Sequence, residues 1–163
     1  MSSAFDRPQA LLAGTALVCV AAVAVALVSQ HGFGMEPCPW CVLQRLQFLA
    51  IALVCGAGLL WRATAGRRLA AALALLLALS GVAAALWQHF VASRSQSCNL
   101  TLADRIVGGL SLDTLLPEVF SPRASCADAM VDLLGLPYDL WSLALFAVVA
   151  VVVLRVLMRA EAH

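Results

Sequence analysis

Cys38 and Cys41 form a Cys-x-x-Cys pair at the start of a long apolar segment, and Arg45 follows four residues after the second sulfur. Two thiols at this spacing can close into a disulfide and open again, and the thiolate is the reactive form. Pro39 suits the first position of a helix, which puts Cys38 at the N-cap, where the helix N-terminus stabilises negative charge. The pattern indicates redox chemistry at a membrane surface.

Arg45 is expected on the same helical face as Cys41, with its guanidinium reaching back toward the sulfur. An arginine at this depth is costly in lipid, which makes it a candidate functional residue. The alternative is a side chain that extends to the lipid headgroups. Beside a thiolate, an arginine can hold the sulfur anionic and donate to a carbonyl oxygen of an electron carrier. A quinone fits this role, because it is lipid-soluble, has two carbonyls and accepts the two electrons that a closing dithiol releases.

The elements that must position these residues are helices that cross a membrane. Hydrophobic residues make up 63% of the 163 residues and charged residues 12%, and the mean hydropathy is +0.96. A soluble domain has about 45–50% apolar and about 25% charged residues. Four stretches reach the roughly 20 apolar residues that a bilayer requires. They predict an all-α, single-domain membrane protein over residues 1–163, with a bundle of four transmembrane helices at 10–29, 42–61, 69–89 and 140–158.

The arginines set the predicted orientation, because the chain has no lysine. The short loop at 30–41 contains no lysine or arginine before the Cys-x-x-Cys pair, and the long loop at 90–139 has three arginines among six acidic residues. The positive-inside rule therefore predicts that both termini are cytoplasmic and that both loops face outward. The net charge of +1 and the absence of a basic stripe give no indication of nucleic-acid binding. The arginines on the predicted cytoplasmic side are Arg7, Arg62, Arg67, Arg68, Arg155 and Arg159.

Two further cysteines, Cys98 and Cys126, lie in the long outward loop, whereas Cys19 and Cys55 lie inside predicted spans and are interpreted as packing residues. If the organism is bacterial, the outward side is oxidising and disulfides persist there. The four outward cysteines allow three pairings, and spacing favours Cys38 with Cys41 and Cys98 with Cys126. A purely structural role for the second pair remains an alternative, because closing such a loop stabilises a fold by about 3.5 kcal/mol.

The chain as a whole resembles the disulfide-bond formation protein B family, the membrane thiol oxidases of bacteria. A Cys-x-x-Cys pair alone is a weak signal, but a Cys-x-x-Cys-x-x-x-Arg run at the start of a span together with two loop cysteines is specific. The matching residues are Gln30-His31, Pro37-Cys38-x-x-Cys41-x-x-x-Arg45, His89, Cys98, Leu115 to Phe120, Cys126, Leu134 to Pro137 and Trp141 to Leu143.

The resemblance implies a bacterial inner-membrane enzyme that reoxidises a soluble periplasmic thioredoxin-like thiol oxidase of the DsbA type. The reduced partner would attack the Cys98–Cys126 disulfide at Cys98, and the released Cys126 would then attack Cys38. Cys41 would leave as a thiolate and pass electrons to ubiquinone or menaquinone held near Arg45. This route from a soluble oxidase through a membrane partner to quinone keeps the bacterial periplasm oxidising.

The resemblance also implies that His89 contacts the quinone, although a polar anchor at the membrane surface is the alternative role. In the long loop, apolar residues between Leu110 and Phe120 recur close to helical spacing. They predict a short amphipathic helix that lies on the membrane surface.

Two other functions are compatible with parts of the pattern. An enzyme similar to vitamin K epoxide reductase also uses four spans, a Cys-x-x-Cys pair and loop cysteines with a quinone, but its active pair sits near the end of the last span of the core. A metal-binding membrane protein would use Cys38, Cys41, His31 and His89 as ligands. Arg45 argues against a metal site, because its charge would repel a cation.

Overall fold

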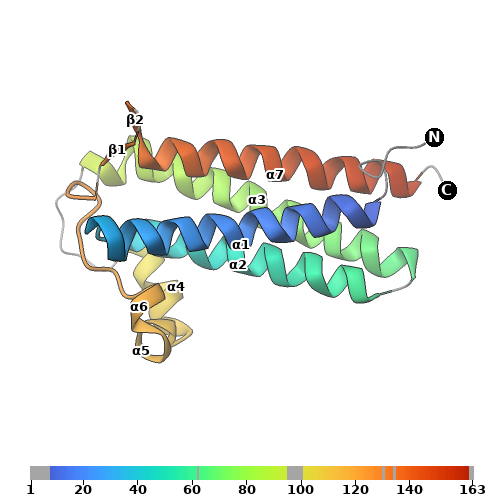
Figure 1. Ribbon diagram of the computed structural model, residues 1–163, viewed down its shortest axis with the longest axis horizontal. Helices are drawn as coiled ribbons and strands as arrows, with labels where there is room; N and C mark the ends of the chain where they lie inside the picture. Colours follow the sequence, from blue (N-terminus) through green and yellow to red (C-terminus); the bar gives the residue numbers. More distant parts are fainter. Residues whose placement is uncertain (1–7, 62, 95–100, 130, 134, 162–163) are drawn as a thin grey trace.

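The computed structural model describes residues 8–61, 63–94, 101–129, 131–133 and 135–161. Four long helices run side by side (Figure 1), and each is long and apolar enough to cross a membrane. The predicted all-α, four-helix membrane architecture is therefore confirmed. The helices extend past the predicted spans at nearly every end, because helical backbone continues beyond the most apolar residues. Their bounds are α1 (Pro8–Phe33), α2 (Pro39–Leu60), α3 (Thr64–Phe90) and α7 (Tyr138–Glu161).

Close packing of α3 against α2 and α7 forms the centre of the bundle. Phe48 of α2 and Phe146 of α7 stack with ring centroids 3.9 Å apart. Gly81 of α3 makes this possible, since a Cβ at that position would collide with the Phe146 ring. Small residues let helix backbones approach closely, which favours association inside lipid. The buried small residues of α3 are Gly66, Ala70, Ala71, Ala74, Ala78, Gly81, Ala84 and Ala85.

The segments that carry Cys38 and Cys126 lie at one end of the bundle, and the start of α1 and the end of α7 lie at the other end with the turn between α2 and α3 (Figure 1). The long loop begins with the 3₁₀ turn η2 (Ala92–Arg94) and then forms three short helices beside the ends of α1 and α2. These are α4 (Leu102–Gly109), α5 (Leu112–Leu115) and α6 (Pro117–Phe120).

The helical segment expected between Leu110 and Phe120 occurs as two separate turns, α5 and α6, rather than as one helix. Leu116 interrupts it with φ −135° and ψ 67°, because a residue before proline is disfavoured in the helical region. The preceding helix α4 was not predicted, although Thr101 and Asp104 form a capping box that marks its start. Its buried Val107 packs with Val42 of α2, so the loop is fastened to the bundle.

A two-residue antiparallel pair, β1 (Asp132–Leu133) and β2 (Leu136–Pro137), leads into α7. Gly135 takes φ +81° in the turn between the strands, a conformation that favours glycine. The backbone N–H of Tyr138 donates to the carbonyl of Val131 at 3.0 Å. This hairpin therefore fixes where the first residues of α7 lie.

Candidate functional site

The Cys-x-x-Cys pair caps α2 as predicted. Cys38 is the N-cap residue, Pro39 begins the helix, and the backbone N–H of Cys41 donates to the Cys38 sulfur at 3.2 Å. The two sulfurs are 2.7 Å apart, and Cys38 is fully buried. The helix start thus holds both sulfurs together, with the N-terminal amides directed at them.

Cys126 lies against Cys38, although 88 residues separate them in the chain. A hydrogen bond with Cys38 lowers the pKa of Cys126, and the same bond raises the pKa of Cys38. The loop is held in place by the backbone N–H of Arg123, which donates to the carbonyl of Pro37 at 2.9 Å. Of these two thiols, Cys126 is therefore the one that ionises more readily, and it lies against Cys38. Cys98 and its predicted pairing with Cys126 lie outside the described residues.

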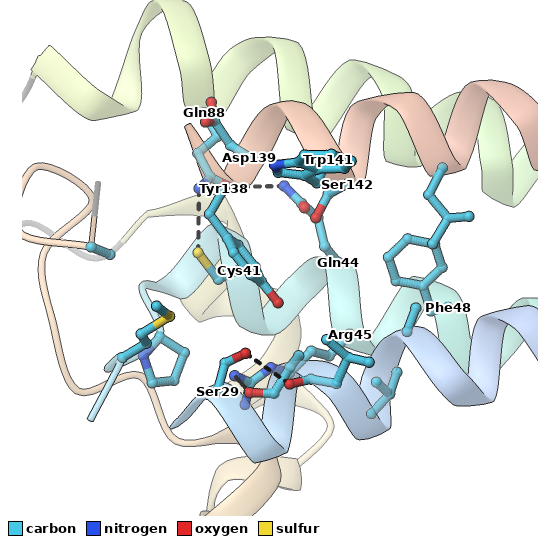
Figure 2. Close-up of a pocket in the computed structure, with 18 of the residues that line it drawn as sticks. Ser29, Cys41, Gln44, Arg45, Phe48, Gln88, Tyr138, Asp139, Trp141 and Ser142 are labelled. Atoms are coloured by element: carbon cyan, nitrogen blue, oxygen red, sulfur yellow. Dashed lines mark hydrogen bonds between the residues drawn. The ribbon is translucent and has the colours of Figure 1, made fainter. Parts of the chain in front are cut away.

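Gln88 of α3 supplies a hydrogen bond to Cys41 that the sequence did not suggest. Its Nε2 donates to the Cys41 sulfur at 3.3 Å, and its Oε1 accepts from Gln44 Nε2 at 2.7 Å, as the dashed lines in Figure 2 show. Both amides are buried. Because Gln44 donates to the carbonyl end of Gln88, the N–H₂ end must point at the sulfur. The signal in the sequence was a polar residue next to His89, at the end of a mostly apolar helix.

Replacing Gln88 with leucine should slow alkylation of reduced Cys41 by iodoacetamide about tenfold, because a hydrogen bond to a charged group contributes about 1.5–3 kcal/mol. The rate is measured by mass spectrometry of the peptide that contains Cys41. Gln47→Leu is the matched control, since Gln47 is a buried glutamine of α2, the helix that carries Cys41, and donates to Ser80 at 3.1 Å instead of to a sulfur. Equal alkylation rates in the two variants would contradict a role for Gln88 in stabilising the thiolate.

Arg45 is buried, so it does not extend to the lipid headgroups. Its Nη1 donates to Gln30 Oε1 at 2.6 Å and to the carbonyl of Val119 at 3.1 Å, and its Nη2 donates to the carbonyl of Ala26 at 3.5 Å. The guanidinium therefore joins α1, α2 and α6. Its charge acts on Cys41, as expected, while the side-chain hydrogen bonds of that sulfur are with Cys38 and Gln88.

A cavity of about 480 Å³ opens between α1 and α7 beside Cys41. Its walls are mostly apolar, with a few polar side chains that converge on the interior (Figure 2). Sites for small molecules typically measure about 300–1,000 Å³ and have this composition. Exposed apolar residues of the two helices, Val25, Trp141 and Val148, form its rim, so a lipid-soluble molecule can enter from the side. The polar side chains that line it are Ser29, Glu36, Cys41, Gln44, Arg45, Gln88, Tyr138, Asp139 and Ser142.

His89 lies at the end of α3, with its Nδ1 2.8 Å from Oδ2 of the buried Asp139. Asp139 lines the cavity, whereas His89 is not among the lining residues. A contact between His89 and a quinone therefore stays a prediction. Asp139 itself was missed by the sequence reasoning, because its proximity to His89 depends on how α3 and α7 pack.

The residues of the metal hypothesis lie apart from one another. His31 Nε2 is 3.8 Å from Glu118 Oε2, and His89 pairs with Asp139. Within the described ranges, no three His, Cys, Asp or Glu side chains group in a way that would hold a metal ion. The two imidazoles thus do not join the cysteine pair in a ligand set.

Known proteins are similar to this chain in sequence over nearly its whole length. The family model of disulfide bond formation protein DsbB matches residues 8–156. The disulfide bond formation protein B of Aromatoleum aromaticum is 36% identical, with 98% of each chain covered. The disulfide bond formation protein B 1 of Pseudomonas savastanoi is 35% identical over 94% of this chain and 91% of the relative. The protein of the same name from Pseudomonas aeruginosa is 34% identical over 85% of this chain and 88% of the relative.

Proposed function

This chain belongs to the disulfide bond formation protein B family, whose members are oxidoreductases of disulfide formation, and we propose that it reoxidises a soluble periplasmic thiol oxidase of the DsbA type. The electrons of that partner pass through two disulfides, Cys98–Cys126 and then Cys38–Cys41, to a membrane quinone. The protein accordingly works in the bacterial inner membrane with both termini cytoplasmic. The distribution of arginines supports this orientation.

The observation that carries this proposal is a row of three neighbouring sulfur atoms, the last of which lines the cavity. Cys126 hydrogen-bonds with Cys38, Cys38 lies 2.7 Å from Cys41, and Cys41 lines the cavity. Disulfide exchange proceeds by attack of a thiolate on a disulfide sulfur. A thiolate at Cys126 is therefore placed to attack Cys38 and to release Cys41 as the leaving thiolate.

The lowered pKa of Cys126 supports this direction of transfer. The thiol that ionises at lower pH is the better source of attacking thiolate near neutral pH. Cys126 becomes available once the soluble partner has attacked Cys98 and opened the Cys98–Cys126 disulfide. Its place in a buried cluster with Cys38, Trp40 and Ala103 of α4 keeps it next to Cys38 during this step.

The cavity beside Cys41 suits the head group of a quinone in size, polarity and access. A bound quinone supplies an acceptor for two electrons. Cys41 faces this site as the electron donor, and Gln88 holds the sulfur by a hydrogen bond. Arg45 offers a positive charge near the place where a quinone carbonyl oxygen would gain electron density. A fixed charge of this kind stabilises the negative charge that develops on the oxygen, and it does so most strongly in a site shielded from water.

Replacing Arg45 with histidine should raise the KM for ubiquinone about tenfold when measured at pH 8, where histidine is mostly neutral. The measurement follows quinol formation with dithiothreitol as the reductant, so that the soluble partner does not enter. Arg155→His is the control, since Arg155 is an exposed arginine near the opposite end of α7. An unchanged KM would reduce Arg45 to a structural link between α1, α2 and α6.

The proposed function is tested with the purified protein in detergent, a reduced DsbA-type partner and ubiquinone. Partner oxidation should require quinone and should stop when the quinone is exhausted. Oxidation of the partner at an undiminished rate without quinone would contradict the proposal. Substituting menaquinone in the same assay identifies which carrier the cavity prefers.

A further inference from the structure

Tyr138 is the first residue of α7, and its ring enters the cavity beside Cys41. Figure 2 shows the side chain extending from the start of α7 toward Ser29 and Arg45. The hairpin before α7 sets this position, because the Tyr138 N–H donates to the carbonyl of Val131 at 3.0 Å. The backbone of Tyr138 is thus fixed at the start of α7, where its side chain enters the cavity.

The hydroxyl of Tyr138 lies within hydrogen-bonding reach of Ser29, and the charges of Arg45 and Cys41 both act on it. Ser29 donates its own hydroxyl proton to the carbonyl of Val25 at 2.9 Å. Because the hydroxyl proton of Ser29 is directed at the Val25 carbonyl, the phenol O–H of Tyr138 keeps its own proton for donation. The hydroxyl of Tyr138 can therefore donate its hydrogen bond to a molecule that binds in the cavity.

Building on the proposed function, we propose that Tyr138 is a further catalytic residue. Its hydroxyl donates a hydrogen bond to a carbonyl oxygen of the quinone in this cavity, and it passes its proton to that oxygen as electrons leave Cys41. The inference is carried by the juxtaposition of a proton donor, the electron-donating sulfur and the Arg45 charge around one cavity.

Atoms and electrons balance without another reactant. Over the whole change from dithiol to disulfide, the Cys38–Cys41 pair gives up two electrons and two protons and forms one S–S bond, and the proton of Cys41 is one of the two when Cys41 reacts as the thiolate. Conversion of a quinone into a quinol takes up the same two electrons and two protons and forms two O–H bonds. Tyr138 gives up one proton and regains one of those that the thiols release, while the Arg45 charge stabilises its phenolate in the interval.

The other charged or titratable groups of the cavity are less suited to this transfer. Arg45 can donate a hydrogen bond but keeps its proton, because a guanidinium is not deprotonated in proteins. Oδ2 of Asp139 is engaged by His89 at 2.8 Å, and Glu36 is an exposed residue of the first loop. Cys41 itself is the electron donor. Tyr138 is the remaining titratable side chain that lines the cavity.

Tyr138→Phe tests the step, because it removes the hydroxyl and keeps the ring. We expect kcat for ubiquinone reduction by dithiothreitol to fall about a hundredfold, as for loss of one donor to a developing oxyanion. KM should change by less than about tenfold, the effect of one neutral hydrogen bond. The control is Phe33→Leu, an exposed aromatic residue at the end of α1. A Tyr138→Phe variant with unchanged kcat overturns the inference.

A second readout does not depend on turnover. Tyr138 is the only tyrosine in the chain, so growth on 3-fluorotyrosine places a single ¹⁹F label in the cavity. Adding a short-chain ubiquinone without dithiol should shift this resonance, and the Tyr138→Phe protein should give no signal. An unshifted line at saturating ubiquinone overturns the inference. A wild-type protein that oxidises its partner without reducing quinone contradicts the proposed function, whereas a full-rate Tyr138→Phe variant contradicts this inference alone.

Discussion

Cys41→Ser should lower the rate of quinone reduction at least about 10³-fold, whichever reductant is supplied, because loss of a reacting nucleophile has effects of this size or larger. A serine hydroxyl cannot form a disulfide with Cys38, and it is not ionised at neutral pH. The change should hardly disturb the fold, because the cap of α2 depends on the Cys38 sulfur and on the backbone N–H of residue 41. The loss would therefore report chemistry and not unfolding.

The measurement is the fall in ubiquinone absorbance with dithiothreitol, recorded at matched amounts of folded protein. Cys19→Ala is the matched control, since Cys19 is a fully buried cysteine of α1 in the main core. It should retain the wild-type rate. Normal quinone reduction by Cys41→Ser would show that electrons reach the quinone from another sulfur, and the proposed order of transfer would be wrong.

Cys126→Ser should separate oxidation of the soluble partner from reduction of the quinone. Oxidation of the soluble partner should fall at least about 10³-fold, because no thiolate can carry electrons from the loop to Cys38. Quinone reduction by dithiothreitol should stay within about twofold, because Cys38 and Cys41 belong to the start of α2, the cavity is lined mainly by α1, α2 and α7, and Cys126 is not among its lining residues. The expected result is one variant with one activity lost and the other retained.

Both activities are measured on the same preparation, with Cys55→Ala as the control at another buried cysteine. Loss of both activities would mean that Cys126 maintains the structure around Cys38, with which it shares a buried cluster. Continued oxidation of the partner would mean that electrons reach Cys38 directly, without the loop cysteine.

The sequence predicted those features that depend on local pattern. Hydropathy located the four spans, and Pro39 after Cys38 identified the helix start and its cap, because both follow from residues adjacent in the chain. Thr101 and Asp104 carried a comparable local signal for α4, which was overlooked. Leu116 broke the expected loop helix because the conformational effect of Pro117 outweighed the apolar spacing.

The partners of Cys41 could not be predicted in this way. Gln88 and Tyr138 belong to α3 and α7, and whether they face Cys41 depends on how each helix is rotated about its axis. Periodicity identifies an apolar face, but these helices are apolar on nearly all sides, so it assigns no unique rotation. Arg45 is a second example. Its spacing from Cys41 correctly predicted the face of α2 on which it lies, but it did not predict its hydrogen-bond partners on α1 and α6.

The central claim is that partner thiols and membrane quinone are joined by one chain of electron transfer through Cys41. The most direct test counts both products in a single reaction of the purified protein with reduced partner and ubiquinone. We predict one quinol for each partner disulfide formed, and neither product with Cys41→Ser. Partner disulfides that accumulate without matching quinol, or quinol formation that survives in Cys41→Ser, would contradict it.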